Sequence, residues 1–358
     1  MTKQSIENKN PLVSADLINL LRSFSSRAEQ EGVLTPEQLS IVVDQKWFKL
    51  FVPTSFGGLE YSLPDGVRLE EELARIDGSL GWTVTLCAGA NLFVGYVGQF
   101  TDQPVGKTVF ADRQVCFGGS GQANGTAVVE DDGYRVTGRW RYATGAPHLT
   151  HFTANCVIEK DGKMLLDVAG KPVVRSFFFP KDDVQIVADW NAFGLKATAS
   201  HSFAVDRLWV DRSQAFIITP EKAVLNQPIY QYPFLQFAEV TLAVNTLGMV
   251  RHFLECAEVL DIKGLRQRLG LARVRIGETA RSFYDNLDAS WHELVRDGRL
   301  SASTEEAISQ CSKDLANVSR ELAITIYPLL GMAGADASSE INRVWRDIFT
   351  ASQHNLLR

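Results

Sequence analysis

The sequence lacks the features that mark several large classes of protein. Its 36 basic residues are outnumbered by 42 acidic ones, which gives a net charge of −6, and no block of like charge occurs. A protein that binds nucleic acid or an anionic membrane surface needs a basic stripe, so we expect neither partner. No apolar run reaches the roughly 18 to 20 residues that span a bilayer, and the first residues contain no apolar segment typical of a signal peptide. We therefore predict a cytoplasmic protein.

Cysteine is scarce, and its positions do not indicate a disulfide framework. The chain has five cysteines, none of them in a CxxC pair: Cys87, Cys116, Cys156, Cys256 and Cys311. We interpret them as small core residues in a reducing compartment. His148 and His151 form an HxxH pair, but no acidic residue or third ligand stands near them in the sequence, and the segment does not read as a helix. The sequence therefore predicts no metal site.

Common catalytic and nucleotide-binding signatures are also missing. There is no GxSxG elbow of a hydrolase, and no cysteine–histidine pairing stands out. The glycine-rich stretch from Gly118 to Gly125 has neither GxGxxG spacing nor a GK[ST] ending, and it lies between expected strands rather than before a helix. We interpret it as a flexible turn that lines a pocket, not as a phosphate-binding loop.

The pattern that is present divides the chain into three parts. Apolar residues recur at helical spacing in the first third, where residues 35–38 read as a capping box and residues 65–98 as a further helix. From about residue 114 the pattern becomes β-rich, and Asp131-Asp132-Gly133 predicts a hairpin.

The last third returns to long helices with one apolar stripe, which predicts an antiparallel bundle. A capping box at Ser303 and Glu306 is expected to open one of these helices. The order argues against a Rossmann fold, because no strand–helix–strand alternation occurs. We predict an α+β protein with an N-terminal helical domain (1–112), a central β domain (113–215) and a C-terminal helical bundle (216–358).

Five local stretches resemble the acyl-CoA dehydrogenase superfamily, and they occur in the order expected for it. They run from about residue 45 to the end of the chain and read "LFVPTSFGGLE", "ELARIDGSLGWTV", "GRWRYATG", "WNAFGLKATASHSFAVDRLWV" and "NRVWRDIFTASQH". The resemblance implies an acyl-CoA dehydrogenase-like fold and a flavin cofactor, FAD or FMN. It also implies a homodimer or homotetramer, since the bundle faces of this superfamily usually pair between subunits.

The resemblance places particular residues beside the flavin. Thr144 would lie near N5 of the isoalloxazine ring, where a hydrogen bond tunes the reduced cofactor. The other positions carried over are Gly118, Gly119, Ser120, Tyr142, Gly145, Trp190, Thr198 and Ser200. From the residues alone, Tyr142 and Trp190 are also ordinary aromatic residues of a β core.

The C-terminal stretch separates two branches of the superfamily. Acyl-CoA dehydrogenases usually carry a carboxylate base nine residues after the signature arginine, and here that position is Asn355. "WRDIFTASQH" instead resembles the ending of two-component flavin monooxygenases, such as the oxygenase of p-hydroxyphenylacetate hydroxylase and dibenzothiophene monooxygenase. The resemblance implies that His354 is catalytic, by deprotonating a phenol or by hydrogen bonding to the oxygen intermediate. In one dehydrogenase branch the base lies on the first bundle helix, where Glu239 falls.

Three interpretations therefore stay open at the level of the sequence. The first is the oxygenase component of a two-component monooxygenase, which takes reduced flavin from a separate flavin reductase and hydroxylates an aromatic or similar small substrate. It is favoured by the absence of the Arg-x-x-Phe-Gly pattern that grips the FAD pyrophosphate in dehydrogenases. The second is an FAD-containing acyl-CoA dehydrogenase-like enzyme, and the third is a non-catalytic member of the fold. The substrate itself is not readable from the residues.

Overall fold

The structure is a computed structural model that describes residues 12–358. Its first part is helical, with five α-helices joined by short loops, two of which contain 3-10 turns. Their bounds are α1 (Ala15–Glu31), α2 (Pro36–Asp44), α3 (Leu63–Ile76), α4 (Gly78–Asn91) and α5 (Val105–Phe110). The capping box expected at residues 35–38 is confirmed, because Thr35 Oγ1 accepts the N–H of Gln38 and the Gln38 side chain accepts the N–H of Thr35.

An eight-stranded sheet forms the middle of the chain. The strands are β1 (Phe117–Glu130), β2 (Gly133–Ala143), β3 (His151–Lys160), β4 (Lys163–Met164), β5 (Val174–Pro180), β6 (Gln185–Val187), β7 (His201–Asp211) and β8 (Ala215–Phe216). They lie in the order β6-β7-β2-β1-β3-β5-β8, with β4 paired to β3. The expected hairpin at residues 131–133 is confirmed, since β1 and β2 pair antiparallel across it.

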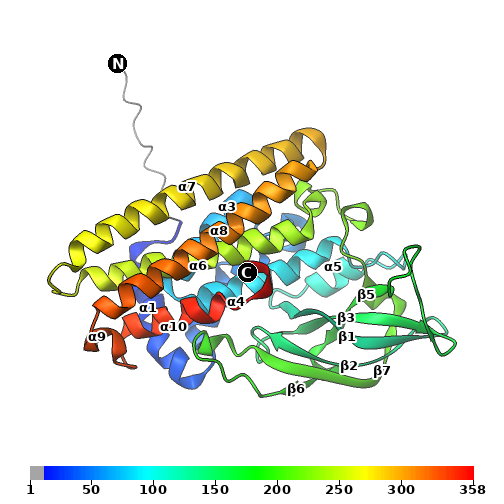
Figure 1. The fold of residues 1–358 in the computed structure, drawn as a ribbon. Helices are drawn as coiled ribbons and strands as arrows, with labels where there is room; N and C mark the ends of the chain where they lie inside the picture. The colour runs from blue at the N-terminus through cyan, green and yellow to red at the C-terminus, as the bar shows by residue number, and fades with distance from the viewer. Residues whose placement is uncertain (1–11) are drawn as a thin grey trace.

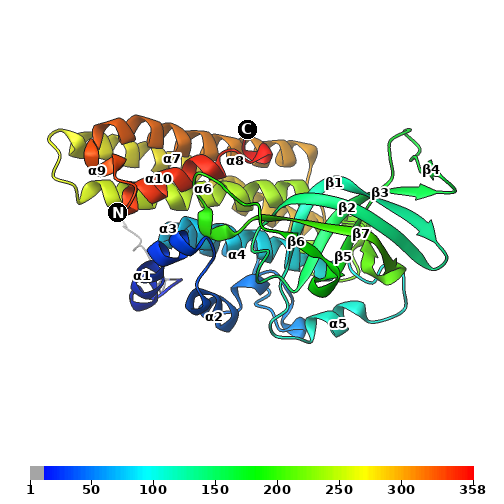
Figure 2. The same cartoon turned by 90° about the horizontal axis from the view of Figure 1, so that it is seen from below.

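The last part is a helical bundle. It contains α6 (Phe234–Glu258), α7 (Leu265–Asp297), α8 (Ala302–Ile326), α9 (Met332–Ala335) and α10 (Glu340–Ala351). The long helices α6, α7 and α8 lie side by side in both views, and the sheet stands at one end of them (Figures 1 and 2). Helix α4 contacts both α6 and β1, so it lies where the helices meet the sheet. The C-terminus returns to the same place, because the turn at residues 355–357 contacts α6 and α8.

Two expectations about the helices are wrong in detail. Residues 65–98 form two helices rather than one, because the Asp77 carboxylate caps the N-terminus of α4 by accepting the N–H of Leu80. Helix α8 opens at Ser301 rather than at Ser303, since the Ser301 hydroxyl accepts the N–H of Thr304. Within residues 12–358, no helix has both the length and the apolar character needed to cross a membrane.

The core of the sheet depends on glycine at a close approach. Trp140 on β2 is fully buried, and its indole N–H donates to the carbonyl oxygen of Asn155. Gly125 on β1 faces this ring, and a Cβ there would lie 2.2 Å from Trp140 Cζ2. The pairing of β1 with β2 therefore requires a residue without a side chain at this position.

Candidate active site

A cavity of about 210 Å³ lies where α4, α6, the sheet and the C-terminal turn meet. Its walls are mainly apolar, with hydroxyl and amide groups at a few points. Five of the sequence-predicted site residues line it: Gly118, Gly119, Ser120, Thr144 and His354. Tyr142, Gly145, Trp190, Thr198 and Ser200 do not. No aspartate or glutamate is among the described residues that line this cavity.

A larger depression of about 530 Å³ lies over α2 and α5 and contains none of the predicted site residues. Basic side chains stand around it, those of Lys46, Lys49, Lys107 and Arg113. It holds no histidine, and it is separate from the cavity that His354 and Thr144 share. We therefore build the candidate site on the smaller, mostly apolar cavity.

His354 enters the cavity from the end of the chain. Its Nδ1 accepts the backbone N–H of Leu356 at 3.3 Å, so the proton of the neutral ring sits on Nε2. The ring lies edge-on to Trp82 of α4, with centroids 6.1 Å apart. Burial lowers the pKa of His354, which keeps the ring neutral near pH 7. His354 is therefore a neutral hydrogen-bond donor at the cavity wall.

Three hydroxyl groups form a chain that ends at Thr144. Thr198 Oγ1 donates to the carbonyl oxygen of Leu195 at 2.8 Å. Since that hydroxyl has one proton, the 2.8 Å contact between Ser200 and Thr198 is a bond donated by Ser200. The 2.9 Å contact between Thr144 and Ser200 must then be donated by Thr144. The Thr144 hydroxyl thus donates its proton to Ser200, and its oxygen can act only as an acceptor toward a further partner.

Arg346 and Asp347 of α10 hold the loop around Leu195, whose carbonyl oxygen is the first acceptor in this series of hydroxyl groups. Arg346 donates to the carbonyl oxygen of Phe193 at 3.0 Å, and Asp347 accepts the N–H of Leu195 at 2.5 Å. The Leu195 carbonyl receives the Thr198 hydroxyl and also the indole N–H of Trp190 at 3.1 Å. The C-terminal signature therefore positions the Thr144 hydroxyl through the Leu195 peptide, a role that the sequence did not reveal.

Tyr142 and Trp190 contact each other away from the cavity wall. Tyr142 has φ of 72° in an irregular part of the β2–β7 pairing, and its side chain is exposed. The left-handed backbone breaks the alternation of the strand, so Tyr142 and Thr144 do not share a face. Trp190 is half-buried and lies 6.0 Å from the Tyr142 ring. Gly145 donates its N–H to the carbonyl oxygen of Thr198, which fixes the turn behind Thr144.

The glycines of β1 are needed for packing as well as for lining the cavity. A Cβ on Gly119 would lie 1.9 Å from the carbonyl oxygen of Thr153, and one on Gly118 would lie 2.6 Å from Leu149 Cδ2. The segment is a β-strand paired parallel to β3, not the flexible turn that we expected from its composition. Ser120 is half-buried at the point where the pairing register shifts.

The Glu239 side chain points away from this cavity, so it cannot act there as a base. It is buried on α6, and its carboxylate accepts the hydroxyl proton of Ser309 on α8. Its neighbour Ala238 lines the cavity, whereas Glu239 does not. The prediction of a possible base at Glu239 is therefore wrong, because the side chain points into the helical bundle.

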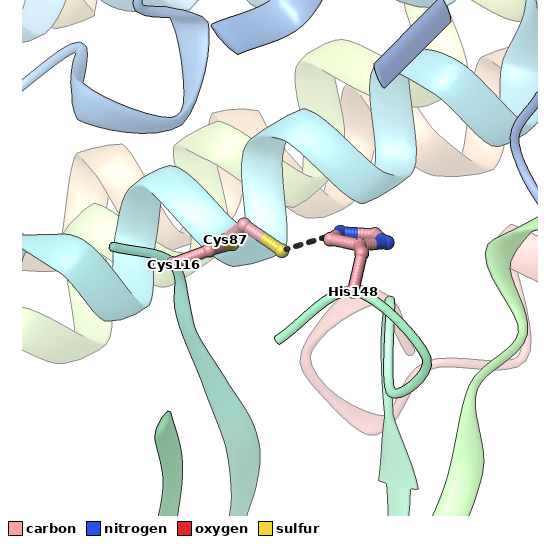
Figure 3. A group of neighbouring side chains, drawn as sticks. All are labelled: Cys87, Cys116 and His148. Carbon is pink, nitrogen blue, oxygen red and sulfur yellow. Dashed lines mark hydrogen bonds between the residues drawn. The ribbon is translucent and has the colours of Figure 1, made fainter. Parts of the chain in front are cut away.

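The structure also brings together a group that sequence reasoning missed. Cys87 on α4, Cys116 just before β1 and His148 in the turn after β2 meet in space (Figure 3). Cys87 Sγ lies 3.9 Å from Nε2 of His148. His151, the other member of the HxxH pair, packs instead against Phe117, with ring centroids 4.9 Å apart. No spacing rule would have found this group, since its members come from three separate elements.

Comparison with known proteins agrees with this architecture. Residues 250–358 match the family model of the acyl-CoA dehydrogenase C-terminal domain. The indole-3-acetate monooxygenase of Acinetobacter baumannii is 24% identical over 321 residues, which cover 86% of this chain and 80% of that protein.

Two further relatives have solved structures. The flavin-dependent monooxygenase oxygenase subunit HsaA of Mycobacterium tuberculosis is 25% identical over 374 residues, covering 96% of this chain and 91% of that protein. Its crystal structure superposes with a TM-score of 0.86 over the same shares of the two chains, at 21% identity. XiaF from Streptomyces sp., solved in complex with FADH2 and glycerol, superposes with a TM-score of 0.81 over 96% of this chain and 90% of that one, at 20% identity. The fold is therefore acyl-CoA dehydrogenase-like.

Proposed function

The chain has the acyl-CoA dehydrogenase-like fold, and its relatives include oxygenase subunits of flavin-dependent monooxygenases; on this premise we propose that it is the oxygenase component of a two-component monooxygenase. Reduced flavin, FAD or FMN, would be supplied by a separate flavin reductase. The substrate would be an aromatic or similar small molecule held in the cavity between α4, α6 and the C-terminal turn.

The observation that carries the proposal is the chemical character of the cavity. A dehydrogenase must remove a proton from carbon, which requires a base such as a carboxylate at the reacting atoms. The described lining contains no carboxylate, and Glu239 is bonded to Ser309 elsewhere. What the lining does contain is one neutral histidine, His354, together with hydroxyl groups, among them that of Thr144, and the amide of Asn155. These groups suit a reaction in which oxygen is activated by the cofactor and the protein orients the partners.

Thr144 is suited to a reduced flavin because its hydroxyl oxygen is available as a hydrogen-bond acceptor. Reduced flavin carries a proton on N5 and, when bound, supplies the electrons that activate O₂. Because the Thr144 hydroxyl donates its proton to Ser200, the Thr144 oxygen can accept the N5–H of the reduced ring. An oxidised ring has no N5–H to donate, so this contact favours binding of the reduced form.

His354 can act on the substrate as a donor. Its Nε2–H has no hydrogen-bond partner among residues 12–358, and the ring lines the cavity. Donation from Nε2 to a substrate hydroxyl would orient the substrate and stabilise negative charge on its oxygen. Direct deprotonation by the same nitrogen does not fit this tautomer, because Nε2 already carries the proton. Donation is therefore the role that we assign to His354.

The assembly and compartment are part of the proposal. Large apolar side chains are exposed on the outer helices of the bundle, among them Leu271 and Val274 on α7 and Ile324 on α8. Such side chains on neighbouring helices favour pairing between subunits, in line with the homodimer or homotetramer expected from the resemblance. All five cysteines are unpaired, which fits a reducing, cytoplasmic compartment. Light scattering after size-exclusion chromatography would give the number of subunits.

The function is tested by replacing His354 with alanine. We expect product formation from reduced flavin, O₂ and an aromatic substrate to fall about 100-fold or more, while the dissociation constant of reduced flavin stays within about twofold. Gln353→Ala is the matched control, because Gln353 is the exposed neighbour and should leave both quantities unchanged. Equal product formation by wild type and His354→Ala would remove His354 from the mechanism. A yellow protein with stoichiometric FAD that an acyl-CoA bleaches would instead support the dehydrogenase interpretation.

A further inference from the structure

Three soft or borderline ligand atoms converge behind the cavity wall. They are Sγ of Cys87, Sγ of Cys116 and a ring nitrogen of His148, and all of them lie within 4.8 Å of one another. Each comes from a different element, and Figure 3 shows the His148 ring directed toward the Cys87 sulfur. The group is outside the described lining of the cavity, so the proposed oxygenation does not account for it.

The surroundings of the group are dry. Cys87 and Cys116 are at most 2% exposed, and the half-buried His148 closes the group on its outer side. The His148 ring stacks on Phe48 with centroids 5.2 Å apart, which holds the imidazole plane in place. Beside the group, the carbonyl oxygen of Thr144 lies 3.9 Å from Cys87 Sγ. An ion bound here would be shielded from water and would touch the turn that carries Thr144.

The spacing suits a small ion that prefers sulfur and nitrogen. With bonds of about 2.3 Å to sulfur and about 2.0 Å to nitrogen, tetrahedral zinc holds its ligand atoms roughly 3.5 to 3.8 Å apart. The 3.9 Å between Cys87 Sγ and His148 Nε2 is already close to this value. The remaining distances, at most 4.8 Å, need a contraction of about 1 Å that small side-chain rotations can supply. We propose that Cys87, Cys116 and His148 form a structural site for one thiophilic d10 cation, Zn²⁺, with the Thr144 carbonyl oxygen as fourth ligand.

The charges balance when the ion binds. Zn²⁺ replaces one proton on each thiol, two protons leave to solvent, and the two thiolates neutralise the dication. The bound ion would tie α4, the start of β1 and the turn after β2 together, and so would stiffen the wall that presents Thr144.

A second group of possible ligands is less suited to the same ion. His252 and Cys256 on α6 stand near Glu340 on α10. There the Glu340 carboxylate already pairs with His252 at 3.1 Å and is itself exposed to water. The interaction with His252 lowers the pKa of Glu340 to about 2, so this carboxylate has its partner without a metal. Cys256 is only half-buried, and the group offers one sulfur instead of two.

The site is tested by metal binding to the purified full-length chain, with no assay of oxygenation. The protein is stripped of metal, kept reduced, and titrated with Zn²⁺ in competition with a chromophoric chelator. Co²⁺ replaces Zn²⁺ in a parallel titration, because thiolate-to-cobalt charge transfer gives an absorption band in the near ultraviolet. The variants are Cys87→Ser, Cys116→Ser and His148→Ala, and Cys311→Ser is the control, since Cys311 is a buried thiol on α8 outside the group.

We expect one Zn²⁺ per chain, an affinity at least about 100-fold lower in each of the three variants, and no change in Cys311→Ser. Zn²⁺ should also raise the midpoint of thermal unfolding of the wild type and of Cys311→Ser, but not of His148→Ala. Should the variants fail to fold, the cobalt spectrum of the wild type decides alone: a band of two-thiolate intensity supports the site, and its absence overturns it. Equal affinity in all variants, or a thiol titre showing a Cys87–Cys116 disulfide in place of metal, would also overturn the proposal. None of these results depends on whether the chain is a monooxygenase.

Discussion

The buried carboxyl of Asp347 should make the stability of the protein depend on pH in an unusual direction. It accepts the N–H of Leu195 at 2.5 Å and is only 3% exposed. Burial, together with the nearby negative charge of Asp77, raises its pKa to about 7, although the hydrogen bond from Leu195 acts in the opposite direction. An exposed aspartate in the unfolded chain has a pKa of about 3.9.

The sign follows from these two values. Because the folded pKa is the higher one, the folded state binds the proton more tightly than the unfolded state. The contribution of Asp347 to stability is therefore fully present below about pH 4 and is lost as the pH rises through about 7. A pKa moved from about 3.9 to about 7 corresponds to at most about 4 kcal/mol. Above pH 7 the folded protein carries this cost in full.

Asp347→Asn removes the titration and keeps an oxygen for the Leu195 N–H. The free energy of unfolding would be measured by urea titration with tryptophan fluorescence. Between pH 5 and pH 8 we expect the value of the variant to rise relative to that of the wild type by about 2 to 3 kcal/mol. The change with pH is the test, because an offset at a single pH also contains the cost of burying the new amide group.

Asp189→Asn is the matched control for the sign. The Asp189 carboxylate accepts hydrogen bonds from Ser202 that lower its pKa, so its contribution is present above about pH 4 and is lost in acid. The control variant should therefore lose stability relative to the wild type at pH 7. Parallel pH profiles for wild type and Asp347→Asn would refute the account of Asp347 as a buried carboxyl group with a raised pKa that links α10 to the Leu195 loop.

Two further substitutions test the contacts that shape the cavity. Thr144→Val removes the oxygen that we expect to accept the N5–H of reduced flavin. Fluorescence titration should show that the variant binds reduced flavin about tenfold more weakly, whereas Thr144→Ser should bind it nearly as well as the wild type. Unchanged binding in the valine variant would contradict the hydrogen-bond direction assigned between Thr144 and Ser200. Gly194→Ala would place a Cβ 2.2 Å from the carbonyl oxygen of Arg346, so thermal and urea unfolding should show a loss of about 1 to 3 kcal/mol. Gly277→Ala, whose Cβ meets nothing within 4 Å on α7, should instead gain about 0.5 to 1 kcal/mol, and equal effects at the two glycines would mean that the Leu195 loop is not tightly packed on α10.

Local sequence patterns predicted those structural elements well that depend on hydrogen bonds or turns between residues close together in the chain. The capping box at Thr35 and the hairpin at Asp131-Asp132-Gly133 depend on residues within three positions of each other, and both are confirmed. The same kind of reasoning placed the start of α8 two residues late. Ser301 and Ser303 are both good caps, and the choice depends on Glu293 of α7, whose carboxylate accepts the N–H of Ser301.

The site was predictable only in part, because its geometry is set by contacts between distant segments. His354 and Thr144 reach the same cavity as expected from the resemblance. The direction of Glu239 depends on α8, and the exposure of Tyr142 depends on one left-handed backbone angle, neither of which the sequence displays. The link from Asp347 to the Leu195 peptide spans 152 residues. The roles of all the predicted site residues, Thr144 and His354 included, stay predictions.

The most direct test of the proposed function is the origin of the oxygen in the product. The protein would be mixed with chemically reduced FMN or FAD and a panel of small aromatic substrates under ¹⁸O₂, and the products would be analysed by mass spectrometry. A monooxygenase transfers one atom of O₂, so the account predicts a product that carries a single ¹⁸O from the gas and none from ¹⁸O-labelled water. The His354→Ala variant should give the same label in far less product. Dehydrogenated product without ¹⁸O, or no product from any substrate with either flavin, would contradict the account.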